Sequence, residues 1–582
     1  MMAPSHPASE SGESLDDPQS RRNTSGEDES EESASTVTGR EEGENATADR
    51  FQTPPGALRS KPADALDSDR EAQHAQQPRV ISILVSLMLG IFLYAIDMTI
   101  VTNAVPRITA EFHTLNHVPW YGSAFFLTNA PFQSVWGKAF NYFDTKRTYL
   151  LSIFVFELGN LVAGAAPNSP ALIAGRAIAG IGGAGIITGA FTIISLAAPP
   201  GRGPACMAIM GATFGCASVV GPLLGGVFTD RLTWRWCFYI NLPLGALAAG
   251  LAILNITGIS AKAASKVPLR EKLWHLDPIG AVLTMVSAGC FLAAMQLGGQ
   301  SHNWAQAGTI APLIGSAVSA LLFLVVEWRL GAQAMIPFRL LRQTAVAANA
   351  VCIFFVAAVY FSLLYLLPLY FQSIGGTSAE GSGLRSIPLI LGVSVFTVIS
   401  NTSMPRVHWA IWLVLGPVIM TSGVACLYTF DLDTPLARVI GFQFLAAAGI
   451  GLVLQVPMAA NQRLVAVTDL AAVTGLTLFF ETLGSLFFTS AVQATLVDGL
   501  VRSIAESGGE SIDPIIVLNV GAADLRAVFS ESELDVVLRS YLYGYKRAML
   551  VLVICAALAV ACSSVAGMLE VGRRRRKPSS AA

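Results

Sequence analysis

Long apolar runs in close succession constrain this chain more than any other feature. From about residue 80 to residue 568, runs of about twenty mostly apolar residues follow one another with short polar breaks. A helix needs roughly 20 consecutive apolar residues to cross the hydrocarbon core of a bilayer. Only 13% of the residues are charged, against about 25% in an ordinary soluble domain. We therefore expect an all-α integral membrane protein.

The runs predict about fourteen membrane-spanning helices. Their approximate ranges are 80–104, 119–137, 148–166, 171–197, 205–228, 237–256, 278–298, 308–326, 345–372, 384–402, 408–428, 437–459, 470–495 and 547–568. We expect two six-helix bundles with two extra helices between them. The corresponding segments are an N-terminal bundle at 80–256, a linker with the two additional helices at 257–344, and a C-terminal bundle at 345–568.

Two polar tails flank the predicted bundles. Residues 1–79 carry seventeen Asp or Glu and eight Lys or Arg, with Phe51 as their single aromatic residue. Such a segment cannot bury enough apolar surface to offset its chain entropy, so we predict a disordered acidic tail. Residues 569–582 form a short basic tail.

The basic residues between the runs test the helix count. Cytoplasmic loops of membrane proteins are enriched in Lys and Arg. With a cytoplasmic N-terminus, the loops that follow even-numbered helices carry Lys138, Lys146, Arg147, Arg202, Lys262, Lys266, Arg270, Lys272, Arg329, Arg339, Arg342, Arg406 and Arg463. One miscounted helix would invert every later loop, yet the bias persists to residues 573–577. We therefore predict fourteen spans with both termini in the cytoplasm.

The loop from 496 to 546 is long and mixes acidic with apolar residues. We predict that it lies outside the cell as a folded segment, with an amphipathic helix near 522–541 rather than a further span.

Ionisable residues inside the spans are the strongest indication of function. Asp97, Glu157, Arg176 and Glu481 each lie within a predicted span. Such residues cost about 2.5–3.5 kcal/mol at a helix centre and usually face an interior cavity. A carboxylate in a low-dielectric site can take up and release protons near neutral pH. All four are therefore candidates for proton coupling, and the alternative is a buried Asp97–Arg176 pair that only locks helices together.

Glycine-rich stretches occur inside two spans. Residues 180–185 match G-x-G-x-x-G, but a dinucleotide site needs a preceding strand, so close helix packing is the better interpretation. A second stretch contains Gly215, Gly221, Pro222, Gly225 and Gly226. Pro222 kinks a helix, and a thin, kinked helix suits two bundles that rock against each other.

The loop after the second span, residues 137–147, is short and dense in charge. Its bases are either topology signals or a latch between the bundles on the cytoplasmic side. The relevant residues are Gly137, Lys138, Lys146 and Arg147.

These motifs together resemble the fourteen-helix drug:proton antiporter branch of the major facilitator superfamily, especially fungal toxin and multidrug efflux transporters. The resemblance runs from about Val80 to Met568. It rests on the 137–147 loop, which departs at Asn141 where the family pattern has Asp, and on the two glycine-rich helices. It also rests on Asp97, Thr99, Ile100 and Val101, on Trp234–Pro243, and on Leu367–Gln372.

The resemblance implies export of toxic or secondary-metabolite organic compounds, driven by inward proton flow, by a monomer in the cell membrane or, alternatively, the vacuolar membrane. Alternating access would move the substrate through a cavity near the midplane. Aromatic and amide groups suit a large amphipathic substrate. Candidate cavity residues are Asn129, Gln133, Tyr360, Phe361, Tyr365, Gln455, Phe479 and Phe480.

Other functions are less consistent with the sequence. No Walker-A pattern occurs, so the chain itself has no P-loop to hydrolyse ATP. The eight cysteines have no metal-binding spacing, and we expect no metal, no cofactor, no nucleic-acid partner and no enzymatic activity. Two alternatives remain, a fourteen-helix importer of siderophore-iron or basic amino acids, and a non-transporting membrane sensor. The sequence does not identify the substrate.

Overall fold

The structure is a computed structural model of the whole chain. It describes the backbone of residues 63–112, 117–199, 202–258, 268–301, 304–507, 512–520 and 525–576. Residues 1–62 and 577–582 lie outside the described residues, and with them most of the predicted acidic tail and the last six residues of the predicted basic tail. The described residues form helices, turns and loops, with no strand among them.

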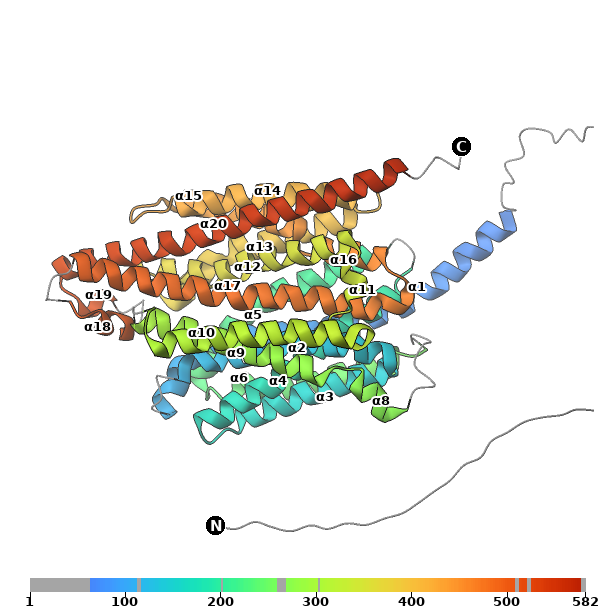
Figure 1. Ribbon diagram of the computed structural model, residues 1–582, viewed down its shortest axis with the longest axis horizontal. Helices are drawn as coiled ribbons and strands as arrows, with labels where there is room; N and C mark the ends of the chain where they lie inside the picture. Colours follow the sequence, from blue (N-terminus) through green and yellow to red (C-terminus); the bar gives the residue numbers. More distant parts are fainter. Residues whose placement is uncertain are drawn as a thin grey trace, which may run out of the picture. The chain divides into compact units, whose positions relative to one another are not determined.

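Seven helices and helix pairs build the chain up to residue 301 (Figure 1). They are α1 (Ala63–Phe112), α2 (Val118–Tyr142), α3 (Thr145–Gly164), α4 (Ser169–Ala197), α5 (Gly203–Arg231), α6 (Trp236–Tyr239) with α7 (Asn241–Asn255), and α9 (Pro278–Ser301). The short helix α8 (Leu269–Trp274) precedes α9.

The remaining chain adds seven more long elements. They are α10 (Ala307–Leu330), α12 (Thr344–Ser373), α13 (Ala379–Ser403), α14 (Trp409–Tyr428), α15 (Leu436–Leu454) with α16 (Val456–Leu464), α17 (Leu470–Ser507) and α20 (Glu531–Arg576). Short helical pieces connect them, namely η2 (Gly331–Gln333), α11 (Phe338–Leu341), η3 (Val467–Asp469), α18 (Pro514–Asn519) and α19 (Leu525–Val528).

Short polar side chains define several helix starts. Asp144 accepts a hydrogen bond from the Arg147 N–H at the start of α3, and Asn168 accepts one from the Ala171 N–H at the start of α4. These caps satisfy backbone donors that have no partner inside the helix. The short loops before α3 and α4 therefore begin new helices at fixed residues.

The prediction of about fourteen spans in an all-α membrane protein is confirmed. Twelve helices in the described part of the chain are long and apolar enough to cross a membrane by length and composition. The other two are α2 and α3, which carry polar residues but pack against α4. Most of their polar side chains face protein rather than lipid, which explains their lower hydropathy.

Three boundaries differ from the sequence predictions. Helix α1 begins at Ala63, so residues 63–79 are helical rather than disordered, because Ala, Gln, Glu and Arg in this stretch favour helix. Helix α17 continues to Ser507, well into the predicted external loop. The helix predicted near 522–541 is not a separate element, because α20 begins at Glu531 and continues through the last span.

Glycine allows backbones to approach closely between helices. A Cβ atom on Gly159 of α3 would overlap the backbone of Ala179 on α4, and one on Gly182 of α4 would overlap the backbone of Phe156 on α3. In lipid, where apolar surface gives little driving force, such close approach supplies the packing energy. The glycine-rich stretch at 180–185 therefore packs helices together.

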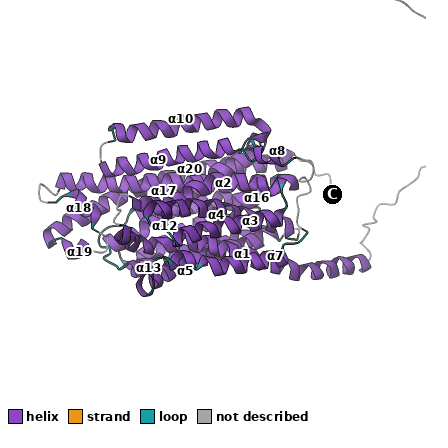
Figure 2. Cartoon of the chain, turned by 90° about the horizontal axis from the view of Figure 1, so that it is seen from below, coloured by secondary structure: helices purple, strands orange, loops and turns teal. Residues whose placement is uncertain are grey.

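The helices from the two predicted bundles meet along two seams. Helix α2 packs against α17, and α5 packs against α13. Helices α9 and α10 pack against each other, and α9 also contacts α2 and α17. Figure 2 shows α10 at the edge of the helix array, beside α9.

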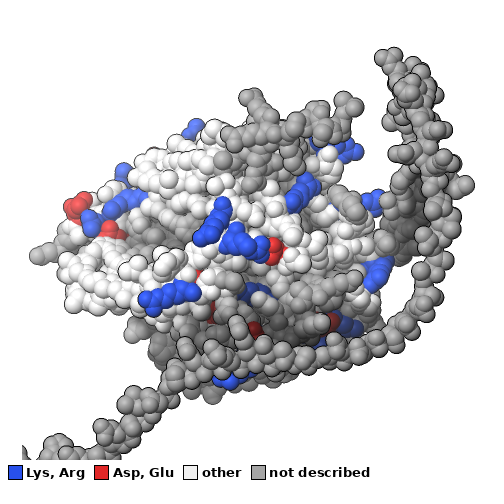
Figure 3. Space-filling model, turned by 45° about the vertical axis from the view of Figure 1, so that its right-hand side comes forward, with Lys and Arg blue, Asp and Glu red and all other residues white. Residues whose placement is uncertain are grey.

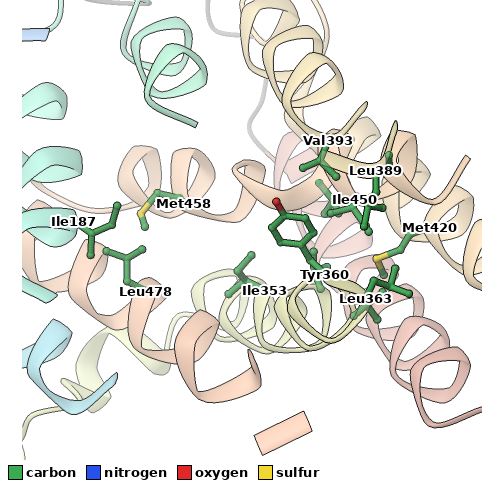
Figure 4. Packing of buried hydrophobic residues seen from close by; sticks show 14 of the residues in the cluster. Ile187, Ile353, Tyr360, Leu363, Leu389, Val393, Met420, Ile450, Met458 and Leu478 are labelled. Atoms are coloured by element: carbon green, nitrogen blue, oxygen red, sulfur yellow. The ribbon is translucent and has the colours of Figure 1, made fainter. Parts of the chain in front are cut away.

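Apolar residues from distant parts of the sequence fill the interior. Figure 4 shows Tyr360 of α12 near Val393 of α13 and Ile450 of α15, all three buried. By contrast, many large apolar residues of α10 are exposed, including Leu321 and Trp328. Figure 3 shows a described surface that is largely uncharged, with Lys and Arg gathered in several groups and few acidic side chains.

Candidate functional site

A cavity lies where helices of both bundles converge. The free space at this convergence is about 770 Å³, including the part that is open to solvent. Residues of α1, α2, α4 and α5 line it from one bundle, and residues of α12, α13, α15 and α17 line it from the other. A site shared by two bundles changes its access when they move relative to each other.

The lining is mostly apolar and aromatic. Its rings are Tyr94, Phe126, Phe191, Phe214, Tyr360 and Phe361. Its polar side chains are Gln133, Ser394, Thr397, Gln455, Glu481, Thr482 and Ser485. Among the described residues that line the cavity, Glu481 is the only charged one. The cavity therefore has one carboxylate and no basic side chain.

A hydrogen-bond chain joins the two bundles beside Glu481. Asn129 donates to the Gly180 carbonyl (3.1 Å) and accepts from the Gln133 amide (3.0 Å). The Thr482 hydroxyl donates to Oε1 of Gln133 (3.0 Å). This contact across the α2–α17 seam lies one residue from Glu481, so any movement of α17 away from α2 changes the surroundings of the carboxylate.

The eight residues predicted to line the cavity divide into two groups. Gln133, Tyr360, Phe361 and Gln455 line it. Asn129, Tyr365, Phe479 and Phe480 do not belong to the lining. Asn129 is fully buried within the hydrogen-bond chain, and Tyr365 packs at the border of the main hydrophobic cluster.

Helix periodicity explains why Phe479 and Phe480 lie elsewhere. The lining residues of α17 are Leu478, Glu481, Thr482 and Ser485, which share one face of a helix. Phe479 belongs to a different hydrophobic cluster, which includes residues of α9 and α10, and Phe480 packs between that cluster and the main one. Their position next to Glu481 in the sequence does not bring them into the cavity.

Asp97 and Arg176 form a buried ion pair away from the cavity lining. The Arg176 Nη1 atom lies 2.6 Å from Oδ2 of Asp97, and the two side chains are 1% and 0% exposed. Arg176 also donates to the Tyr121 carbonyl (3.1 Å), and Asn241 donates to Oδ1 of Asp97 (3.3 Å). The guanidinium lies 4.7 Å from the centre of the Phe125 ring. This cluster joins α1, α2, α4 and α7.

Glu157 lies in a different environment. Both of its carboxylate oxygens are buried with no hydrogen-bond partner among the described residues. They lie against Gly245 of α7, where a Cβ atom would overlap the carboxylate. Gly245 is one helical turn beyond Asn241, so Glu157 lies near the Asp97 cluster but makes no bond to it.

The glycines of α5 contact both bundles. A Cβ atom on Gly221 would overlap the Thr99 hydroxyl of α1, and one on Gly215 would overlap the Ser394 hydroxyl of α13. Pro222 lies inside the helix. Further along, the Thr229 hydroxyl donates to the Gly225 and Gly226 carbonyls (both 2.9 Å).

The loop predicted at 137–147 is mostly helical, because α2 continues to Tyr142 and α3 begins at Thr145, and its basic residues do not form one cluster. A Cβ atom on Gly137 would lie 2.7 Å from the Ala471 carbonyl of α17. Lys138 is 6% exposed and bonds to residues around α9 and α10. Lys146 donates to the Ile253 carbonyl near the end of α7 (2.5 Å), and Arg147 is exposed.

Sequence reasoning missed several lining residues, including Tyr94, Phe126, Phe191, Phe214 and Thr482. Helical spacing could have found one of them, since Tyr94 lies one turn before Met98, which follows Asp97 and also lines the cavity. It also missed the buried carboxylates Asp277 and Glu327. Glu327 is visible as an acidic residue at the end of an apolar run.

A cavity between two bundles of membrane-spanning helices defines a membrane transport protein. The family model described as Major Facilitator Superfamily matches residues 87–489. The chain belongs to this family. The superfamily resemblance read from the motifs is thus confirmed.

Known proteins of similar sequence and structure agree with this assignment. The chain is 40% identical over 492 residues to the MFS-type transporter grgE of a Penicillium species, covering 83% of this chain and 87% of that protein. It is 36% identical over 522 residues to the dehydrocurvularin exporter of Aspergillus terreus, covering 89% and 90%. The fold is similar to a bacterial homologue of the human lysosomal transporter Spinster (TM-score 0.52, 16% identity, covering 84% and 97%).

Proposed function

We propose that this protein is a proton-coupled exporter of uncharged or cationic amphipathic organic compounds, and that Glu481 carries the coupling proton. The observation that carries the proposal is the position of Glu481, the only charged residue among the described residues of the cavity lining. The relative from Aspergillus terreus is named as an exporter of dehydrocurvularin, which favours export of a secondary metabolite.

The proposed cycle uses one carboxylate for two ligands. When the cavity faces the cytoplasm, deprotonated Glu481 accepts hydrogen bonds from a substrate. When it faces outside, a proton binds Glu481, so the substrate faces a neutral acid instead of a charged acceptor, binds more weakly and leaves. Return to the cytoplasmic side releases the proton down its gradient. Each ligand shifts the equilibrium only by its differential affinity for the two conformations.

The geometry favours Glu481 over the other candidates. Asp97 is occupied by Arg176 and Asn241, so a substrate would have to displace a buried ion pair to reach it. Glu157 is not part of the cavity lining. We assign the Asp97–Arg176 pair a structural role, because it holds helices of the first bundle together.

The test compares Glu481→Gln with Glu506→Gln, an exposed carboxylate on the same helix. Purified protein in liposomes is given a fluorescent probe, rhodamine 123, with and without a pH gradient. We expect Glu481→Gln to exchange the probe at equilibrium but to lose accumulation driven by the gradient, and Glu506→Gln to accumulate it normally. Normal uphill transport by Glu481→Gln would remove this residue from the coupling step.

The charge of the cavity gives a second test. Rhodamine 123 is the methyl ester of rhodamine 110, so the two probes differ by one carboxylate. A cavity with a carboxylate and no basic side chain should repel a second carboxylate. We expect at least tenfold weaker binding of rhodamine 110 by fluorescence anisotropy in detergent. Equal affinities would contradict the proposed substrate class without bearing on coupling.

We place the protein in the cell membrane with both termini in the cytoplasm and residues 496–546 outside. The alternation of basic loops supports this orientation. A tag inserted at position 510 should be reachable by antibody on intact cells, and tags at either terminus should not. A protected tag at 510 would mean that the orientation is inverted or that the helix count is wrong by an odd number.

A further inference from the structure

The hairpin formed by α9 and α10 is attached to α2 at the end where its two helices join the rest of the chain. The Lys138 Nζ atom, near the end of α2, donates to the His275 carbonyl just before α9 (3.0 Å) and to the Gln333 carbonyl just after α10 (2.7 Å). The Tyr142 ring of α2 stacks on His275 at 5.4 Å. A single buried ammonium therefore binds the chain just before α9 and just after α10, at the open end of the hairpin.

Two buried carboxylates make this base of the hairpin rigid. Oδ2 of Asp277 accepts from the Met335 N–H (2.8 Å), and Glu327 accepts from the N–H groups of Met335 (3.1 Å) and Ile336 (2.7 Å). Both carboxylates also attract the Lys138 ammonium. Removing Lys138 from this site would leave buried charges uncompensated, which is costly.

The closed end of the hairpin, where α9 connects to α10, is attached to the other bundle. The Trp304 indole N–H, in the connection between α9 and α10, donates to Oδ1 of Asp498 on α17 (3.2 Å). Asp498 is also bonded to Arg502 and Arg547, each at 3.2 Å. If the neutral indole leaves, Asp498 keeps both guanidinium partners, so this contact is the less costly one to break.

Helix α9 thus lies between two helices that belong to different bundles. Alternating access moves α2 and α17 relative to each other, so α9 cannot keep both sets of contacts. A pocket with the polar side chains Ser123 of α2, Gln296 of α9, and Ser490 and Gln493 of α17 lies where the three helices meet.

From these contacts we infer that Lys138 fixes the α9–α10 hairpin to the first bundle, so that the hairpin moves with α2 and slides against α17 during transport. The Trp304–Asp498 contact forms in one conformation and breaks in the other. Lys138 is a positioning residue in this scheme, acting through the hairpin rather than on the substrate. The inference rests on the proposed transport function.

Two cysteine pairs test which bundle the hairpin follows, in a chain whose eight native cysteines are replaced. The α17 pair is Gly299→Cys with Ala494→Cys, since a Cβ atom on Gly299 would lie 3.4 Å from that of Ala494, close to disulfide geometry. The α2 pair is Gly289→Cys with Leu127→Cys; because a Cβ atom on Gly289 would lie 3.8 Å from the Leu127 methyl carbons, two bonds beyond the Leu127 Cβ, formation of this disulfide is first verified by loss of thiol labelling.

Rhodamine 123 efflux is first measured with both cysteine variants in the reduced form. A lack of efflux at this stage would contradict the proposed transport function, before any cross-link tests the hairpin. We expect oxidation of the α17 pair to lower rhodamine 123 efflux at least tenfold, with recovery after dithiothreitol. Oxidation of the α2 pair should change efflux less than twofold. The reverse pattern, inhibition by both pairs, or inhibition by neither would each overturn the inference.

The role of Lys138 itself is tested by combining changes. In the Lys138→Met variant the hairpin is no longer fixed to α2. Oxidation of the α17 pair in this variant should therefore lower rhodamine 123 efflux less than twofold, compared with efflux by the same variant in its reduced form. Lys146→Met is the matched control, because Lys146 lies in the first turn of α3, close to Lys138 in the sequence, but bonds to the end of α7. It should leave the tenfold effect of the α17 disulfide intact. An undiminished effect in Lys138→Met would overturn the assignment.

A second measurement does not need net transport. Disulfide yield in vesicles should be the same for the α2 pair with and without rhodamine 123, because that contact is kept throughout. The yield of the α17 pair should change with the probe, because binding shifts the population between conformations. An unchanged yield for the α17 pair, or a changed yield for the α2 pair, would contradict a hairpin that moves with the first bundle.

Discussion

The Asp97–Arg176 pair yields a prediction whose size follows from its geometry. The Asp97→Asn variant keeps the shape of the side chain and one oxygen that can accept from Arg176, but it leaves the guanidinium as an uncompensated buried charge. Arg176 then retains the Tyr121 carbonyl and the Phe125 ring as partners. Breaking a buried pair by removing one partner typically costs about 3–5 kcal/mol. Since one acceptor remains, we expect about 3 kcal/mol.

The main effect of Asp97→Asn should be on stability, because a loss of about 3 kcal/mol lowers the ratio of folded to unfolded protein roughly a hundredfold. We expect Asp97→Asn to reach the membrane in much lower amount and to unfold at a lower temperature in detergent. Adding Arg176→Gln should recover at least half of the loss, because two neutral amides replace the unmatched charge. Glu111→Gln serves as control, since its ion pair with Arg235 is partly exposed to solvent and exposed pairs contribute about 0–1 kcal/mol.

Two results would refute this reasoning. One is an Asp97→Asn variant of normal abundance and stability, which would mean that the pair does not hold α1 to α4. The other is a double variant that is less stable than the sum of the two single changes predicts. If Asp97→Asn were stable and lost only uphill export while Glu481→Gln kept it, the coupling proton would belong to Asp97.

The remaining predictions concern close contacts of glycine. Gly215→Leu should insert normally but lose rhodamine 123 efflux, because the new side chain would push α5 away from Ser394 of α13; Gly250→Leu, at a position with open space around it, should export normally. Gly245→Ala should lower thermal stability by about 1–3 kcal/mol through overpacking against Glu157, measured as a fall in the unfolding midpoint. Glu157→Ala in the same chain should restore it, and a midpoint that stays low would contradict this contact as the cause.

The fold could be predicted from the sequence because lipid leaves few alternatives. Every backbone polar group in the hydrocarbon region must be satisfied within the chain, so an apolar run of this length has to be helical. Even α2 and α3, which fall below the hydropathy of the other spans, follow from the spacing of their neighbours. The boundaries of α17 and α20 were harder to predict, because helix continues into water wherever the sequence favours it.

The site could be predicted only in part, because a carboxylate in an apolar run does not reveal its partner. Asp97, Glu157 and Glu481 look alike in the sequence, since each is a single acid among apolar residues. In the structure one is ion-paired, one has no hydrogen-bond partner among the described residues, and one lines the cavity. The partner of Asp97 is 79 positions away, and periodicity carries no information on such a pairing.

Lys138, which the sequence predicts in a loop and the structure places near the end of α2, shows the same limit. In the sequence it is one of several bases that follow an even-numbered span, which is fully explained as a topology signal. Its hydrogen-bond acceptors lie 137 and 195 positions away. Only the packed structure distinguishes it from Lys146, which bonds to the end of α7 instead.

The two seams between the bundles are built differently, and this bears on how they can move. At α5–α13 the contact is made by Gly215 against Ser394, with no side chain of α5 between the helices at that point. At α2–α17, Gly137 and Gly475 meet backbone to backbone, and α9 covers the same pair of helices. Glycine surfaces have no side chains to interlock, so helices can slide on them without repacking a core. The inserted hairpin adds contacts at one seam alone, so we expect motion at α2–α17 to depend on Lys138 and motion at α5–α13 to depend on its glycines.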